Sequence, residues 1–340
     1  MEYAPVLIPT LCRYDHFVRC IESLKKNTWA LYTDIYVALD YPANESHWEG
    51  YNKICEYLDG SFDEFANFYV IKRPYNYGAE KNVADLRKII LEKYDRFIRT
   101  DDDCEFSINF LEYMNKSLEK YKDDENVLGV TGYSYPVNWK IDSKYNAFKN
   151  SLIFSMWGTG FWKNKFLKMQ KDIESGYIKK NFRLKNPGMF KMTDACYLDC
   201  INGKFSYESS NLIMHVTDVS CGCYMQLSGK YIITPTISKV RNYGFDGSGI
   251  YCQKIVDKGK EDNAKFYNYS LQEIDMSNKI DLMVEENYRF EEKYKILNEF
   301  NCRNKKLVLK AKIKYCLKYT IIKIFNEHFY KELIGKIKKK

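Results

Sequence analysis

The sequence predicts an α/β protein with a mixed, mostly parallel sheet flanked by helices, followed by a helical, basic C-terminal tail. Short apolar runs alternate with amphipathic runs over roughly the first third of the chain, a pattern typical of β-α-β units. The chain has 340 residues and 45% hydrophobic content, which is enough to bury a substantial core. It contains neither G-x-G-x-x-G nor G-x-x-x-x-G-K-[ST], so neither a dinucleotide-binding fold nor a P-loop is indicated.

Each expected element of the first half has its own pattern. Strands are expected where apolar residues run together, at residues 5–9, 34–40, 68–74 and 96–100. Helices are expected where apolar residues recur at helical spacing, at residues 15–27, 47–58, 83–94 and 110–121. The second half is less regular. It offers a Gly-Thr-Gly turn within 151–166, a strand at 230–235 and a glycine-rich loop that ends at 249.

Polar side chains follow three of the expected strands. Thr10 and Arg13 come after the first strand, Asp40 ends the second, and Asp101–Asp103 follow the fourth. Ligands of open α/β sheets bind at the carboxyl ends of the strands. We therefore expect these side chains to converge on one crevice.

Three consecutive aspartates at a strand end suit a hard divalent cation. Mg²⁺ and Mn²⁺ take oxygen ligands, usually one or two carboxylates together with phosphate oxygens and water. Such a cation offsets the negative charge that develops on a diphosphate leaving group. The alternative interpretation is an acidic turn that caps the helix expected at 110–121.

The segments VLIPTLCRYDHFVRCIESL, VALD, NYGAEKN and RTDDDCEF resemble the GT-A nucleotide-sugar transferases. Among these they are similar to the N-acetylglucosaminyltransferase I-like branch and to related bacterial polysaccharide glycosyltransferases. That branch carries a metal motif of an acid, two aspartates, an apolar residue and a glutamate, followed by a helix with F-x-x-Y. Residues 101–105 and 110–113 match this motif. The resemblance covers roughly residues 4–250 and implies a Rossmann-like GT-A fold.

The resemblance also implies roles for individual residues. The metal, Mn²⁺ or Mg²⁺, would bind Asp103. The nucleotide-sugar would contact, in chain order, Pro9, Thr10, Arg13, Asp40, Gly78, Lys81, Asp101, Asp102, Gly247 and Ser248. Within this set Asp40 would meet the uracil base, and Asp101 and Asp102 would face the ribose or the donor sugar. WGTGFW would lie on the acceptor side through Gly158, Gly160 and Trp162.

An inverting transfer needs a base that takes the proton of the acceptor hydroxyl. The family's catalytic aspartate lies on a short helix before the strand expected at 230–235, and Asp218 falls at that place. Asp194 is the alternative, although it could instead cap a helix after Thr193. His215 could serve as a base or a metal ligand, but a lone histidine among apolar residues is more often a strand residue. Asp246 is most simply a turn aspartate.

Charge is distributed unevenly along the chain. Residues 303–340 hold thirteen Lys or Arg and two Glu, a net charge of +11, which leaves −3 for residues 1–302. The tail alternates basic and apolar residues, as expected of an amphipathic helix that lies on an anionic membrane surface. The alternative is a terminal helix that packs its apolar side on the domain. No nucleic-acid-binding motif accompanies the charge, so no nucleic-acid partner is expected.

Eleven cysteines, an odd number without zinc-finger spacing, indicate reduced thiols in a cytosolic protein. Neither a signal peptide pattern nor an 18-residue apolar stretch occurs in the sequence. Together with the tail, this predicts a cytoplasmic protein that associates peripherally with the inner face of the membrane.

The domain organisation expected from these patterns has three parts. Residues 1–255 form a GT-A catalytic domain, with a nucleotide-binding half at 1–105 and an acceptor half with a capping loop at 106–255. A helical extension at 256–302 and the basic amphipathic tail at 303–340 follow.

The expected function is metal-dependent, inverting transfer of a sugar from a UDP-sugar to a glycan or lipid-linked glycan. The donor would be a UDP-N-acetylhexosamine or a UDP-hexose. One alternative is a nucleotidyltransferase acting on a sugar phosphate, although LIPTLCRYD lacks the glycine-rich, basic phosphate loop that this reaction favours. The other is a non-enzymatic protein that binds anions through its tail.

Overall fold

A computed structural model describes residues 2–135, 138–151, 153–181, 215–244, 246–249, 273–288, 313, 316–317 and 320–337. The chain divides into two compact units, each described by itself below. Unit 1 comprises Met1–Leu167 and Lys230–Tyr288, and unit 2 comprises Lys168–Gly229 and Arg289–Lys340.

Unit 1 is built on a sheet of nine strands in the order β11-β7-β9-β6-β8-β4-β1-β2-β3. The strands are β1 (Val6–Thr10), β2 (Asp34–Leu39), β3 (Asn67–Lys72), β4 (Arg96–Arg99), β6 (Val127–Thr131), β7 (Ala147–Asn150), β8 (Thr159–Trp162), β9 (Tyr231–Pro235) and β11 (Val284–Glu285). Neighbours are parallel except at β4–β8, β8–β6 and β7–β9. A separate antiparallel ribbon joins β5 (Cys104–Phe106) to β10 (Val240–Asn242). The predicted α/β class with a mixed, mostly parallel sheet is confirmed.

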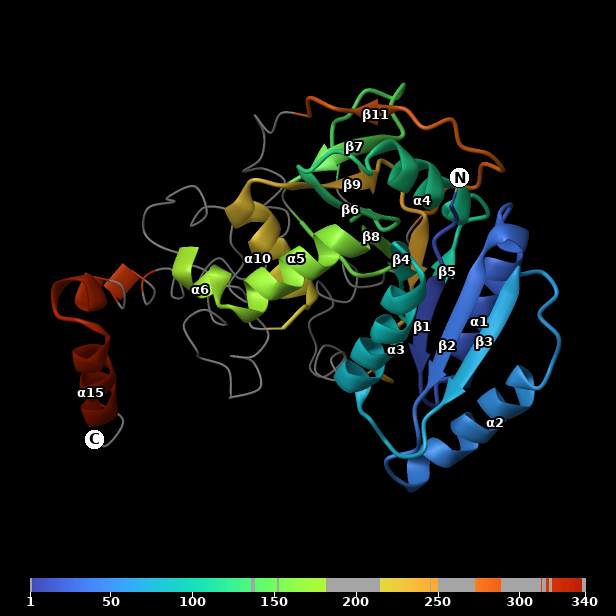
Figure 1. Cartoon of the computed structure of the whole chain (residues 1–340), viewed down its shortest axis with the longest axis horizontal. Helices are drawn as coiled ribbons and strands as arrows, with labels where there is room; N and C mark the ends of the chain where they lie inside the picture. The colour runs from blue at the N-terminus through green and yellow to red at the C-terminus, as the bar shows by residue number, and fades with distance from the viewer. Residues whose placement is uncertain are drawn as a thin grey trace. The chain divides into compact units, whose positions relative to one another are not determined.

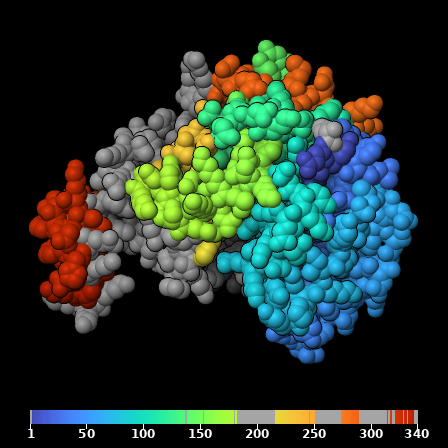
Figure 2. Space-filling view, viewed as in Figure 1, coloured from blue at the N-terminus to red at the C-terminus, as the bar shows by residue number. Residues whose placement is uncertain are grey.

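Helices cover this sheet as the alternating pattern predicts. They are α1 (Tyr14–Lys25), α2 (Trp48–Leu58), α3 (Ala79–Lys93) and α4 (Phe110–Lys120), with short 3₁₀ turns η1 (Ala30–Tyr32) and η2 (Glu45–His47). Helix α3 packs on β1, β2 and β4, and α4 packs on β6 and β8, as Figure 1 shows. In the space-filling view these two helices lie on the face turned towards the viewer (Figure 2).

The core follows from the apolar runs of the sequence. The central strands β1 and β4 are buried at nearly every position, as expected of parallel strands covered on both faces. Helix α1 turns Phe17, Cys20, Ile21 and Leu24 towards the sheet, and all four are fully buried. Each such apolar side chain contributes about 1.5–3 kcal/mol on burial. The core thus fixes the strand ends from which the polar side chains project.

The Gly-Thr-Gly segment differs from its prediction. Gly158 is a turn residue with a φ of 60°, but Thr159–Trp162 form β8, which lies between β4 and β6. Gly160 lies against Met114 and Leu118 of α4, so closely that a Cβ would be 3.0 Å from Met114. The small residues let the helix approach the strand, a reason that a turn pattern does not reveal.

Residues 273–288 are the described part of the segment expected as a helical extension. They form an extended stretch that carries β11 in place of a helix. The buried Lys239 ammonium pairs with Asp275, and Tyr121 donates to Glu286 at 2.5 Å. Burial lowers the pKa of Lys239. Burial opposes ionisation of Asp275, but its bonds to Lys239 and Ser277 lower the pKa to about 2. These contacts fasten the segment to unit 1.

Unit 2 is described at three short helices and most of α5 (Lys163–Glu174), whose residues from Lys168 on belong to it. The others are α6 (Tyr177–Asn181), α10 (Asp218–Ser228) and α15 (Glu327–Ile337). Thr217 and Ser220 form a reciprocal capping box at the start of α10, and Gly229 ends the helix with a φ of 67°. Among the described residues of the whole chain, no helix is both long and apolar enough to cross a membrane.

Candidate functional site

The carboxyl ends of β1 and β4 bring Thr10, Arg13 and the aspartate run together. Asp102 is buried, with 5% of its surface exposed. Its Oδ2 accepts a hydrogen bond from Thr10 Oγ1 at 2.7 Å, and its Oδ1 accepts one from the Arg13 guanidinium. Residues about 90 positions apart in sequence thus meet because their strands are neighbours in the sheet.

Arg13 bridges two carboxylates. Besides Asp102, its Nη1 lies 2.9 Å from Oδ2 of Asp103. Burial alone would lower the pKa of Arg13, but the charges of Asp102 and Asp103 raise it well above its ordinary value. The guanidinium therefore stays protonated between the two carboxylates.

Asp103 is held from the other side by the ribbon of β5 and β10. Asn242 Nδ2 donates to Asp103 Oδ1 at 2.8 Å, and the Tyr243 amide donates to the Asp103 carbonyl at 2.8 Å. Gly244 lies so close that a Cβ at this position would overlap Asp103 Oδ2. The glycine is required because the chain passes directly over the carboxylate.

Asp101 completes the run, and its Oδ1 accepts a hydrogen bond from Arg99 at 2.7 Å. Burial raises the pKa of Asp101, which Arg99 opposes and Asp103 reinforces. Burial likewise raises the pKa of Asp103, and Arg13 opposes this effect. The carboxylates repel one another, and a cation in their midst would relieve that repulsion.

The donor set fits a hard divalent cation. The described residues contain no cluster of three or more His, Cys, Asp or Glu that could enclose a metal ion. Mg²⁺ and Mn²⁺ do not need one, because one or two carboxylates suffice when phosphate oxygens and water complete the shell. Asp103 and Asp101 supply such carboxylates. The role predicted for Asp103 remains a prediction.

Asp40 is organised differently. It is buried, and its carboxylate accepts hydrogen bonds from the backbone amides of Tyr41 at 2.9 Å, Tyr77 at 2.7 Å and Gly78 at 2.8 Å. Asn76 adds a longer contact of 3.4 Å. Asp40 thus fastens the loop after β3 to the end of β2, and its predicted contact with a nucleobase is untested.

The loop after β3 and the start of α3 carry Gly78 and Lys81, which were predicted to contact the nucleotide-sugar, together with Arg73 and Tyr77, which were not singled out. The buried Arg73 donates to Asn82 at 2.8 Å and pairs with Asp85. Gly78, with a φ of 75°, begins helix α3. Lys81 is exposed, and its ammonium lies 4.1 Å from the ring centre of Tyr77. The signal for Arg73 was its place directly after an apolar strand.

Pro9, also predicted to border the nucleotide, lies within β1. It is opposite Ala38 of β2 in the parallel register and is partly exposed.

The predicted capping loop lies against helix α1. The Asp246 carboxylate accepts hydrogen bonds from the Ser248 amide at 2.8 Å and the Ser248 hydroxyl at 2.6 Å, which makes it a turn aspartate as expected. Its other oxygen lies 2.8 Å from His16 Nε2. Burial opposes ionisation of Asp246, but the bonds to Ser248 and His16 lower the pKa to about 2. Gly247, with a φ of 93°, allows the turn.

The sequence analysis also missed His16. A contact between residues 230 positions apart leaves no local pattern.

The residues predicted for the acceptor side are built into the core of unit 1. Gly158 and Gly160 are buried against α4, and the Trp162 indole, 4% exposed, donates to the Leu118 carbonyl at 3.1 Å. These contacts give the predicted acceptor role no support.

The predicted bases belong to unit 2. Asp218 is exposed and is the first residue of α10, a short helix that precedes β9 in the chain as expected. His215 is exposed, and its carbonyl accepts a hydrogen bond from Ser220 Oγ at 2.6 Å. Asp194 lies outside the described residues.

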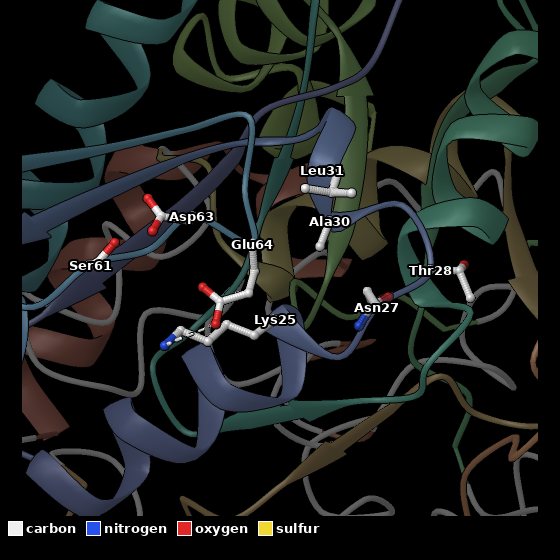
Figure 3. Close-up of a pocket in the computed structure, with 8 residues that line it drawn as sticks. All are labelled: Lys25, Asn27, Thr28, Ala30, Leu31, Ser61, Asp63 and Glu64. Carbon is white, nitrogen blue, oxygen red and sulfur yellow. Dashed lines mark ion pairs between the residues drawn. The ribbon is translucent and has the colours of Figure 1, made fainter.

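A shallow depression of about 580 Å³ lies elsewhere on unit 1 (Figure 3). Its lining comes from residues 25–31, which precede β2, and residues 61–64, which precede β3. It therefore lies at the amino ends of these strands, the edge opposite the aspartates. Lys25 and Glu64 meet across it at 3.8 Å.

Comparison with known proteins gives no matching protein-family model and no matching curated protein. Solved structures do match. Crystal structures of S. aureus TarS and of TarS 1-349 align at 14% and 15% identity, with TM-scores of 0.33 and 0.35. A mannosyltransferase, PcManGT from Pyrobaculum calidifontis in complex with GDP-Man and Mn²⁺, aligns at 14% identity with a TM-score of 0.34.

The alignments cover 49–50% of this chain and, in that order, 30%, 49% and 46% of the other chains. Fewer than half of the residues of each neighbour are therefore spanned. At these scores the similarity concerns the arrangement of strands and helices and carries no residue-level correspondence.

Proposed function

We propose that this protein is a GT-A glycosyltransferase that transfers a sugar from a UDP-sugar to a glycan or lipid-linked glycan, with Mn²⁺ or Mg²⁺ and with inversion. The observation that supports it best is the aspartate run after β4, where Arg13, Thr10 and the chain from β10 meet around Asp102 and Asp103. Cations and carboxylates gathered at the carboxyl edge of a parallel sheet suit a nucleotide diphosphate. From the motif resemblance of residues 101–105 and 110–113 we further propose a relation to the N-acetylglucosaminyltransferase I-like branch and related bacterial polysaccharide glycosyltransferases.

The bound cation would neutralise charge on the leaving diphosphate. Asp103 would hold it, with Asp101 beside it. Arg13 offers a guanidinium whose planar fork matches phosphate oxygens. The loop that contains Gly247 and Ser248 contacts His16 through Asp246 and Ser248. This loop would cover the donor and exclude water.

Asp218 is the proposed base, and Asp194 is the alternative. The exposed carboxylate of Asp218 lies at the start of α10, where solvent and an acceptor hydroxyl can reach it.

The tail is proposed to bind the inner face of a membrane. Its described residues expose large apolar side chains amid the basic ones, with Ile313, Leu317, Ile324, Phe325 and Phe329 between 40% and 66% exposed. Such a surface suits the interface of an anionic bilayer.

Thermal unfolding with UDP tests the proposal. UDP with Mn²⁺ should raise the Tm, whereas UDP with a chelator should raise it far less, since a ligand that binds only the folded state stabilises by about 2.7 kcal/mol at 100 Kd. UTP with a sugar phosphate gives the matched test of nucleotidyl transfer. A Tm that responds to neither UDP nor Mn²⁺ would contradict the proposal.

A further inference from the structure

Both oxygens of Asp103 already have partners. Oδ1 accepts from Asn242 at 2.8 Å, and Oδ2 lies 2.9 Å from the Arg13 guanidinium. Gly244 also lies beside Oδ2, so close that an added Cβ would overlap this oxygen. Asn242 is the last residue of β10, and Gly244 follows it two residues later, so both are held near Asp103 by the path of this chain segment. A cation can therefore reach Asp103 most directly from the position that Arg13 occupies.

Arg13 is the partner that can leave. It lies between β1 and α1, just before the first helical residue, and its side chain retains 22% exposure. A change of side-chain rotamer withdraws the guanidinium without altering either element. Asp102 would keep its bond from Thr10. Asp103 would exchange one positive partner for another, whereas Asp102 would lose the guanidinium, and the positive charge of the nearby cation would offset part of that loss.

We propose, on the basis of the proposed function, that Arg13 is a resident counter-ion that must leave Asp103 before a divalent cation binds, which makes the cation and a diphosphate bind cooperatively. Without an anion, the incoming cation meets the repulsion of the guanidinium. A diphosphate removes this opposition because it offers Arg13 a bidentate partner of its own. By linkage, the cation must strengthen diphosphate binding by the same factor, and such couplings are about 5–150-fold.

Titration calorimetry of the full chain with Mn²⁺ alone, and of UDP with and without saturating Mn²⁺, tests this inference. In the wild-type protein, Mn²⁺ alone should bind weakly and should tighten UDP binding. In Arg13→Gln, Mn²⁺ alone should bind at least about tenfold more tightly, because one positive charge beside the site has been removed. The factor by which Mn²⁺ tightens UDP binding should be smaller than in wild type, because only the direct attraction between the cation and the diphosphate then remains.

Two further variants serve as controls for the loss of charge and for a folding defect. Arg241→Gln removes the same charge from β10, where Arg241 pairs with Glu105 at 3.1 Å, and it should change Mn²⁺ affinity much less than Arg13→Gln. Arg13→Lys keeps a charge but cannot span both carboxylates. It should bind Mn²⁺ alone more tightly than wild type, which keeps the test decisive if the glutamine variant folds poorly.

The outcomes separate the inference from the proposed function. If wild type binds UDP with Mn²⁺ but neither Arg13 variant binds Mn²⁺ alone more tightly, Arg13 is not a counter-ion of this kind and the inference falls, while the function stands. If wild type shows no Mn²⁺-dependent UDP binding, the proposed function falls first and the inference with it.

Discussion

Two aspartates at the same edge of the sheet, the buried Asp40 and the partly buried Asp103, are stabilised in contrasting ways. Asp40, after β2, takes its hydrogen bonds from three backbone amides. Asp103, after β4, takes its bonds from the side chains of Arg13 and Asn242. The backbone amides that bond Asp40 can move only if the loop changes conformation. The Arg13 guanidinium can leave Asp103 through a change of side-chain rotamer. The contrast indicates that Asp40 is a structural fastening and that Asp103 is available to exchange ligands.

The largest effect is expected at Asp103. Asp103→Asn should retain the fold and lower turnover with a UDP-sugar by about 10²-fold or more, because the amide loses the charge that would hold the cation. Release of UDP from a panel of UDP-sugars measures this effect and identifies the donor at the same time. Turnover near that of wild type, or full activity with excess chelator, would refute a metal role for Asp103.

Asp40→Asn is the matched variant, since it makes the same chemical change at the other strand end. The new amide group would face a backbone N–H instead of accepting from it, so the free energy of unfolding should fall by about 1–3 kcal/mol. Urea denaturation measures the loss. A variant as stable as wild type would show that these amide bonds are not what fastens the loop.

Asp218, unlike Asp40 and Asp103, is an exposed carboxylate, and it is the proposed base. Asp218→Asn should lower turnover by about 10²–10⁴-fold and leave Mn²⁺-dependent UDP binding nearly unchanged, as expected for a general base. Asp194→Asn is the control. An inactive Asp194 variant beside an active Asp218 variant would transfer the role to Asp194.

The smallest effect on catalysis is expected from the tail. Deleting residues 303–340 should leave turnover on a small acceptor largely intact but abolish sedimentation with anionic vesicles, since each near-surface charge contributes about 1 kcal/mol. Higher salt should weaken binding of the full chain. Vesicle binding that survives the deletion would place the membrane site elsewhere, and a truncated protein that misfolds would show that the tail packs on the domain.

The first four strands and the aspartate cluster were predictable because both depend on local pattern. Apolar runs marked β1 to β4 to within about two residues of their ends, and parallel topology then brought their polar ends together. Strand β8 was not predictable as a strand, since Gly160 is needed for close packing against α4 and such a requirement leaves no periodic pattern in the sequence. His16 and Asn242 were missed because their partners lie 230 and 139 positions away.

We expect Asp103, and not Asp40, to couple a divalent cation to the nucleotide. The most direct measurement is the Tm increase caused by UDP, with Mn²⁺ and with chelator, in wild type, Asp103→Asn and Asp40→Asn side by side. The account predicts that Asp40→Asn starts from a lower Tm but keeps the Mn²⁺-dependent increase, whereas Asp103→Asn starts near the wild-type Tm and loses that increase. A Mn²⁺-dependent increase of wild-type size in Asp103→Asn would contradict the account.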